Sequence, residues 1–207
     1  MSDLHSINEA INKRAGRKLG PSIAVSLFLL ALIWFALAYE RVIFAGLVTA
    51  AVILGLREMR MALSTSNIAI SFKALTLASL GLGYASWVGG VAGLAIATAI
   101  AFPCLLIWLL REGPEQFVAK ATATSLALIY LPFLAGFIIL LARPSNGLAQ
   151  VMTFVVLVGC NDTFGYLVGV LIGKHPMAPK ISPKKSWEGL VGSMIFTPVG
   201  GALTFHY

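Results

Sequence analysis

The chain has 207 residues, of which 58% are hydrophobic and 11% are charged, and its formal net charge is +7. So large an apolar fraction excludes a soluble domain of this size, and the apolar runs are continuous, whereas the strands of a membrane β-barrel alternate with period two. The two cysteines, Cys104 and Cys160, lie in apolar runs and give neither a disulfide framework nor metal-ligand spacing. The sequence predicts an all-α, polytopic integral membrane helical bundle.

The first 20 residues are polar and basic. Leu4, Ile7 and Ile11 recur at helical spacing, and four lysines and arginines follow them. This pattern is typical of an amphipathic helix that lies on an anionic membrane surface, and a disordered basic tail is the alternative. We therefore expect a cytoplasmic N-terminal segment over residues 1–20 and one transmembrane domain over residues 21–207.

Seven apolar runs follow and predict about seven transmembrane helices. Their approximate limits are 22–39, 42–57, 72–87, 89–110, 120–142, 148–172 and 188–205. A tight turn is expected over residues 86–90, between the third and fourth helices. Pro103, Pro132 and Pro198 fall inside predicted helices, and each should kink its helix because proline lacks an N–H and clashes with the preceding turn.

Charge predicts the orientation. With the N-terminus in the cytoplasm, 13 of the 15 lysines and arginines lie in cytoplasmic segments, and only Arg41 and Arg143 lie outside. Cytoplasmic loops carry an excess of these residues. The sequence therefore predicts seven helices, a cytoplasmic N-terminus and a cytoplasmic loop over residues 173–187. Glu112 and Glu115 are interpreted as solvated loop residues.

Asp162 lies within an apolar helical run. A carboxylate inside a membrane is costly unless it is paired or binds a cation, so it marks a functional site, with an ion pair to another helix or a head-group position as structural alternatives. Gly165, Gly169 and Gly173 follow on the same face and form a ladder of small residues that allows close helix packing. The ladder predicts that Asp162 points into the protein. Asn161 is a second oxygen donor.

The loop after this helix is rich in lysine and proline. Its three prolines exclude a continuous helix and predict a rigid, extended segment that presents lysines and serines. Ser186 is placed to cap the next helix, with Glu188 in its first turn. A helix N-terminus beside lysines and hydroxyls suits a phosphate group, although an ordinary basic loop explains the charges alone.

The stretch from Asp162 to Gly189, which ends in ISPKKSWEG, resembles the phosphatidate cytidylyltransferase (CDP-diacylglycerol synthase) family. Nearly thirty consecutive residues fit that family's pattern. The resemblance implies transfer of CMP from CTP to phosphatidic acid, which gives CDP-diacylglycerol and pyrophosphate, with Mg²⁺ or another divalent cation. It also implies an enzyme of phospholipid biosynthesis in the cell inner (plasma) membrane. A homodimer is expected, and nucleic acid is not an expected partner.

The resemblance and the residue pattern together give the candidate site. Asp162 is the candidate metal ligand, and Asp162 and Lys185 are the candidate catalytic residues. The candidate substrate-binding residues are Asn161, Tyr166, Lys174, Lys180, Ser182, Lys184, Lys185, Ser186 and Glu188.

One departure from the family pattern stands out. The family's histidine-glycine-glycine segment and its further acidic metal ligands do not occur before Tyr207, so we expect the chain to be C-terminally incomplete and, as it stands, inactive. Two other functions stay open from the sequence: a cation-coupled or proton-coupled transporter that uses Asp162, and a CTP-dependent polyprenol or phytol kinase. A transporter would need no nucleotide.

Overall fold

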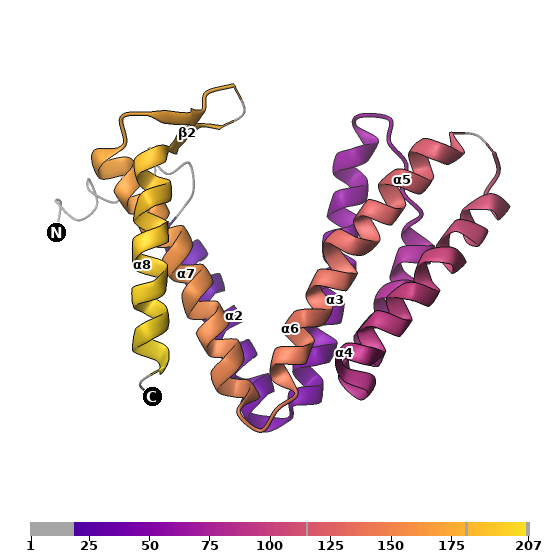
Figure 1. Ribbon diagram of the computed structural model, residues 1–207, viewed down its shortest axis with the longest axis horizontal. Helices are drawn as coiled ribbons and strands as arrows, with labels where there is room; N and C mark the ends of the chain where they lie inside the picture. The colour runs from indigo at the N-terminus through magenta and orange to yellow at the C-terminus, as the bar shows by residue number, and fades with distance from the viewer. Residues whose placement is uncertain (1–18, 115, 181, 206–207) are drawn as a thin grey trace. The chain divides into compact units, whose positions relative to one another are not determined.

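The computed structural model describes residues 19–114, 116–180 and 182–205 of the chain (Figure 1). The predicted amphipathic segment lies outside the described residues, except for its last two positions, which begin α2. The elements in chain order are α2 (Leu19–Tyr39), α3 (Arg41–Ser64), α4 (Phe72–Arg111), α5 (Phe117–Leu128), the π-helical turn η1 (Ile129–Phe133), α6 (Leu134–Ala142), α7 (Gly147–Ile172), β1 (Pro176–Ala178), β2 (Ser182–Ser186) and α8 (Trp187–Phe205).

Within the part of the chain that the structure describes, four helical segments are long and apolar enough to cross a membrane: α3, α4, the run from α5 to α6, and α7. The predicted class of helical membrane protein is therefore confirmed. The chain divides into two compact units, unit 1 up to Arg143 and unit 2 from Pro144 onward. Each is described by itself below.

In unit 1, α4 is a helical hairpin. Its 40 residues would span about 60 Å as one straight helix. Yet Ser71, just before α4, donates from Oγ to Glu112 Oε1, just after it, at 2.7 Å. The chain reverses at Gly90, whose φ of 65° lies in the left-handed region that favours glycine. This reversal confirms the predicted turn over residues 86–90.

Leucines from both arms of this hairpin fill the core of unit 1. Leu75 and Leu82 come from the first arm, and Leu94, Leu105 and Leu109 come from the second, all at most 3% exposed. They pack with residues of α3 and α5 in one cluster. The α5–α6 segment passes Pro132 through the π-helical turn η1, which accommodates a residue that cannot donate to the helix ladder.

Basic residues make contacts at both ends of unit 1. At one end the guanidinium of Arg60 lies over the ring of Phe72, 5.3 Å from its centre, and Lys120 pairs with Glu112. At the opposite end Arg41 donates to the carbonyl of Arg143. The orientation predicted from charge therefore stays a prediction.

Candidate functional site

The predicted site residues lie in unit 2, where α7 and α8 pack antiparallel and a short hairpin joins them (Figure 1). Glycines from both helices bring the two backbones together. A Cβ on Gly189 would meet the carbonyl oxygen of Gly165 at 2.6 Å, and a Cβ on Gly169 would meet Ser186 Oγ at 3.2 Å. The predicted small-residue ladder is thus a helix-packing surface, as its spacing indicates.

Asp162 lies at the edge of this packing surface. Its side chain is exposed, and its described hydrogen bond is local, from Asn161 Nδ2 to Asp162 Oδ1 at 3.3 Å. The prediction that the glycine ladder turns the carboxylate inward is therefore wrong within unit 2, because the ladder contacts α8 without burying Asp162. Tyr166, one turn further along α7, is 68% exposed.

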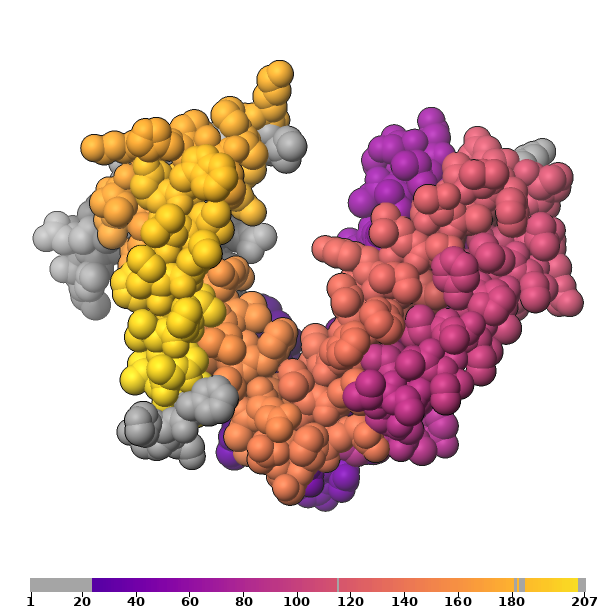
Figure 2. Space-filling model, viewed as in Figure 1, coloured from indigo at the N-terminus to yellow at the C-terminus, as the bar shows by residue number. Residues whose placement is uncertain are grey.

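The lysine-rich loop forms an antiparallel hairpin that the sequence analysis did not predict. Strand β1 pairs with β2, with Pro176 opposite Ser186 and Ala178 opposite Ser182. We call residues 176–186 the lysine hairpin, and in Figure 2 it extends from one end of unit 2 in orange. Lys180 follows β1 and is exposed, and Lys185 lies in β2 and is exposed. The hairpin thus holds its lysines on a paired backbone.

Glu188 and His175 close the base of the lysine hairpin. Glu188 Oε1 lies 2.6 Å from His175 Nδ1, and Glu188 Oε2 accepts from the backbone N–H of His175 at 3.3 Å. The backbone N–H of Trp187 donates to the carbonyl of His175 at 3.0 Å. Glu188, predicted to bind substrate, therefore has a partner within the protein. The sequence analysis did not identify the contact between His175 and Glu188, because their separation of 13 residues matches neither a helical nor a strand repeat.

Ser186 joins the hairpin to α8. Its Oγ accepts from the backbone N–H of Gly189 at 3.2 Å, which confirms the predicted N-cap. The first turn of α8 also carries Glu188, as predicted. Lys185 directly precedes this capped terminus. An exposed lysine beside a helix N-terminus is an arrangement that binds phosphate.

The structure does not bring all of the candidate residues together. Asp162 lies about 15 Å along the axis from the end of α7 at Ile172, given a rise of 1.5 Å per residue. Ser182, Lys184, Lys185 and Ser186 lie in β2, and Lys174 precedes the hairpin. The candidate residues thus form two groups within unit 2, an acidic group in the middle of α7 and a basic group at its end.

The residues at Asp162 can supply oxygen ligands. A carboxylate oxygen of Asp162 and the amide oxygen of Asn161 are the ligand types that Mg²⁺ prefers, and Mg²⁺ usually keeps several waters and takes one or two carboxylates. Among the described residues, no group of three or more His, Cys, Asp or Glu side chains is arranged to hold a metal. The donor set fits a hydrated divalent cation and not a closed protein cage.

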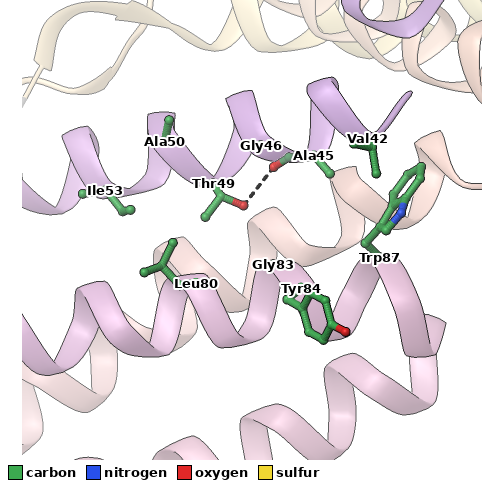
Figure 3. Close-up of a pocket in the computed structure, with 10 residues that line it drawn as sticks. All are labelled: Val42, Ala45, Gly46, Thr49, Ala50, Ile53, Leu80, Gly83, Tyr84 and Trp87. Carbon is green, nitrogen blue, oxygen red and sulfur yellow. Dashed lines mark hydrogen bonds between the residues drawn. The ribbon is translucent and has the colours of Figure 1, made fainter. Parts of the chain in front are cut away.

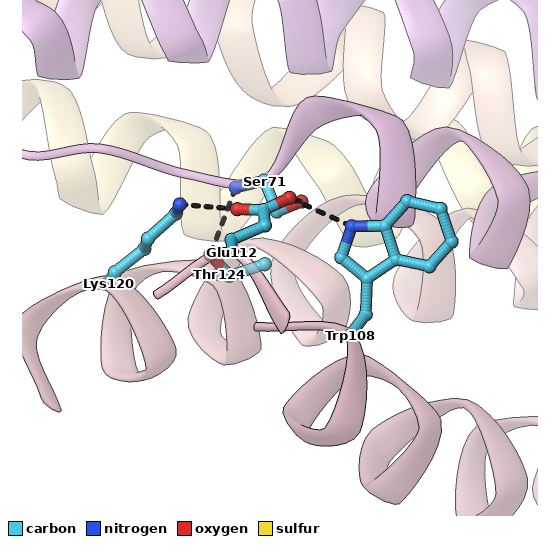
Figure 4. Close-up of polar contacts among 5 residues, drawn as sticks. All are labelled: Ser71, Trp108, Glu112, Lys120 and Thr124. Atoms are coloured by element: carbon cyan, nitrogen blue, oxygen red, sulfur yellow. Dashed lines mark hydrogen bonds and ion pairs between the residues drawn. The ribbon is translucent and has the colours of Figure 1, made fainter. Parts of the chain in front are cut away.

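Unit 1 holds a second polar site that sequence reasoning misjudged. Glu112 accepts from Ser71 Oγ at 2.7 Å and from Trp108 Nε1 at 2.8 Å, and it pairs with Lys120 (Figure 4). Partial burial raises the pKa of Glu112, but the hydrogen bonds from Lys120, Ser71 and Trp108 outweigh it and hold the pKa below its ordinary value of 4.5. The interpretation of Glu112 as a solvated loop residue is therefore wrong, because both ends of α4 and the start of α5 converge on it.

An apolar groove of about 330 Å³ lies between α3 and α4, with Val42 and Trp87 at one end and Ile53 and Leu80 at the other (Figure 3). The residues lining it include no ionisable acid or base apart from the hydroxyl of Tyr84. This groove holds none of the predicted site residues. Its lining suits hydrocarbon and not nucleotide chemistry.

The fold and the site define a helical membrane protein with an acid inside an apolar helix and a lysine-rich hairpin beside a capped helix. A model described as the cytidylyltransferase family matches residues 22–207. The chain is 30% identical to the phosphatidate cytidylyltransferase of Mycobacterium bovis over 88% of this chain and 64% of that protein. It is 31% identical to that of Mycobacterium leprae over 92% of this chain and 66% of that protein.

The chain therefore belongs to the cytidylyltransferase family. It spans less than two thirds of the length of these two curated relatives. A shorter match, 31% identical over 56% of this chain, is the phosphatidate cytidylyltransferase of Haemophilus influenzae.

Proposed function

We propose that this protein transfers CMP from CTP to phosphatidic acid and releases pyrophosphate, so that it makes CDP-diacylglycerol for phospholipid biosynthesis. Two lines support the proposal. The curated relatives carry the name phosphatidate cytidylyltransferase. The stretch from Asp162 to Gly189 carries the motif on which the resemblance rests.

The lysine hairpin is the observation that carries this proposal. It is closed at its base by Glu188 and His175, and it leads through Ser186 into a capped helix N-terminus. The reaction joins two anions, since an oxygen of the lipid phosphate attacks the α-phosphorus of CTP. A P–O bond forms there as the bond to the β-phosphate breaks and pyrophosphate leaves.

The residues of the chain lower the charge barrier to this reaction. Lys180 and Lys185 bind and orient the triphosphate, and the backbone N–H groups at the start of α8 favour anions. Lys184 and Ser182 line the same strand, and Lys174 adds a cation before it. No nucleophilic side chain is needed, because the lipid phosphate is itself the nucleophile.

Asp162, with Asn161 beside it, would hold Mg²⁺ or another divalent cation. When bound, the cation would neutralise charge on the phosphates of the nucleotide. Tyr166, exposed one turn from Asp162, would contact substrate on the same face of α7. The separation of the acidic and basic groups suits a long, extended substrate such as a nucleoside triphosphate.

The proposed enzyme crosses the inner membrane seven times, with its N-terminus and the lysine hairpin in the cytoplasm. The reversal of α4 at Gly90 supports the count, because α2, the two arms of α4 and the remaining helices then match the seven predicted runs. The count of lysines and arginines along the sequence supports the orientation. A homodimer stays a prediction, and light scattering of the purified protein in detergent would test it.

The decisive experiment uses membranes that contain the full-length protein, labelled CTP, phosphatidic acid and Mg²⁺. We expect labelled CDP-diacylglycerol, and we expect Asp162→Asn to abolish its formation at unchanged expression. Glu58→Gln makes the same change from carboxylate to amide at an exposed acid of unit 1 and should keep the activity. Absence of any CTP-dependent lipid product from the full-length protein would overturn the proposal and favour a transporter.

A further inference from the structure

A polar pocket of about 280 Å³ lies where the two arms of α4 end, lined by Lys73, Trp108, Arg111 and Glu112. Lys73 comes from the start of the first arm, and Trp108 and Arg111 come from the end of the second. The reversal at Gly90 is what brings these residues together. The pocket lies in unit 1, and it includes none of the residues that the proposed reaction uses.

The charge of this pocket is positive because its acid is already neutralised. Glu112 pairs with Lys120, which does not line the pocket, and accepts from Ser71 and Trp108 (Figure 4). Among the described residues, neither Lys73 nor Arg111 has a carboxylate within ion-pair distance. Two cations therefore face a hollow without a counter-ion, an arrangement that attracts an anion.

The size and the surroundings of the pocket indicate which anion. At about 280 Å³ it has room for a phosphate head group, and its lining includes a pair of cations and one indole ring. One helical turn from Lys73 and Arg111, on the same faces, lie the apolar side chains of Leu77 and Ile107, which are 57% and 55% exposed. Trp108, 37% exposed, is of the type that lies at a membrane boundary.

From this geometry we propose that the pocket binds the phosphate of an anionic membrane phospholipid that is not the substrate. Lys73 and Arg111 contact the phosphate, and the indole of Trp108 packs beside the glycerol backbone. The acyl chains run along the exposed apolar side chains of the two arms, beginning at Leu77 and Ile107. Bound lipid would hold the two ends of the α4 hairpin together, alongside the Glu112 contacts.

Native mass spectrometry of the purified full-length protein, titrated with phosphatidylglycerol or with phosphatidylcholine, tests this proposal. We expect preferential binding of phosphatidylglycerol. A cation near a lipid surface contributes about fivefold in affinity, so Arg111→Gln should weaken this binding about fivefold and the Lys73→Gln/Arg111→Gln pair about thirtyfold. Lys73→Arg keeps the charge and should keep the binding, which separates loss of the site from loss of the fold.

Arg57→Gln is the matched control. It removes an exposed arginine from the basic end of α3, outside the pocket, and should change the affinity by less than twofold. An equal loss in Arg57→Gln and Arg111→Gln, or equal binding of the two lipids, would overturn the proposal in favour of diffuse interfacial charge. Displacement of phosphatidylglycerol by millimolar inorganic phosphate would overturn the lipid assignment and make the pocket a site for soluble phosphate.

Discussion

Unit 1 and unit 2 hold their helices together by different means. Unit 1 buries leucines, with Leu56, Leu75 and Leu128 fully enclosed, whereas Val151 is the only buried large hydrophobic residue among the described part of unit 2. In unit 2 the contact between α7 and α8 relies on glycines, together with the stacked rings of Phe164 and Phe196, whose centres are 4.3 Å apart. Large side chains such as Leu171 and Met194 are exposed. Buried leucines therefore dominate the packing of unit 1, whereas close backbone approach at glycines is the main feature of the packing in unit 2.

The two units also treat charge differently. In unit 1, Glu112 is satisfied by Ser71, Trp108 and Lys120. In unit 2, Lys180 and Lys185 are exposed on a short hairpin, and Asp162 is exposed in an otherwise apolar helix. The acid Glu112 of unit 1 thus joins helix ends, whereas Asp162, Lys180 and Lys185 of unit 2 are exposed.

The largest expected effect tests the leucine core. Leu82→Ala should lower the free energy of unfolding of unit 1 by about 2 kcal/mol. This is the low end of the range for truncating a buried leucine, because in a membrane protein the alternative environment of the side chain is apolar lipid and not water. Leu82 is 2% exposed, and the matched Leu167→Ala in unit 2 alters a side chain that is 45% exposed. The melting temperature in detergent should fall clearly for the first and hardly at all for the second. Similar shifts would show that the two units do not differ in packing.

An effect of similar size is expected at a glycine of unit 2. A Cβ at Gly189 would meet the carbonyl oxygen of Gly165 at 2.6 Å and Gly169 Cα at 3.2 Å, so Gly189→Ala should push α7 and α8 apart at a cost of about 1–3 kcal/mol. Gly159 has nothing within 4 Å, so Gly159→Ala is the control. Hydrogen exchange of the amides at the start of α8 should rise only in Gly189→Ala, and exchange equal to wild type would refute close backbone packing.

Much of this division could be predicted from the sequence. The apolar runs place the helices, Gly90 falls in the predicted turn, and the spacing of Gly165, Gly169 and Gly173 identifies a packing face. These features are local, and each depends on residues within a few turns of one another. The N-cap at Ser186 could also be predicted, because it joins residues only three positions apart.

The contacts that could not be predicted join residues far apart in the chain. Glu112 meets Ser71, 41 residues earlier, only because α4 reverses, and sequence periodicity carries no signal for that pairing. The two strands of the lysine hairpin are too short and too rich in proline to show alternation. The exposure of Asp162 depends on the exact angle at which α8 meets α7, which the glycine ladder alone does not fix.

The Glu112 contacts give a third, pH-dependent effect. The pKa of Glu112 is lowered in the folded protein. The stability that Glu112 contributes is therefore complete above its ordinary pKa of 4.5 and is lost as the pH falls through the lowered pKa. Glu112→Gln should reduce stability by about 1 kcal/mol at neutral pH, since the group is partly exposed, and should flatten the acid side of the stability profile. Melting temperatures from pH 7 to pH 3 would measure this. An unchanged slope in Glu112→Gln would exclude Glu112 as the titrating group.

The smallest expected effect concerns the base of the lysine hairpin. His175→Ala removes the ring contact with Glu188 but leaves the two backbone hydrogen bonds of residue 175, from its N–H to Glu188 and from Trp187 N–H to its carbonyl. The hairpin should stay paired but hold its lysines less rigidly. We expect the KM for CTP to rise about threefold with kcat nearly unchanged. His175→Asn keeps a hydrogen-bond donor near Glu188, so its KM should lie between those of the wild type and His175→Ala. A fall in kcat with an unchanged KM would instead place His175 at the reacting phosphate, and the charge of unit 2 would then act on the chemical step as well as on binding.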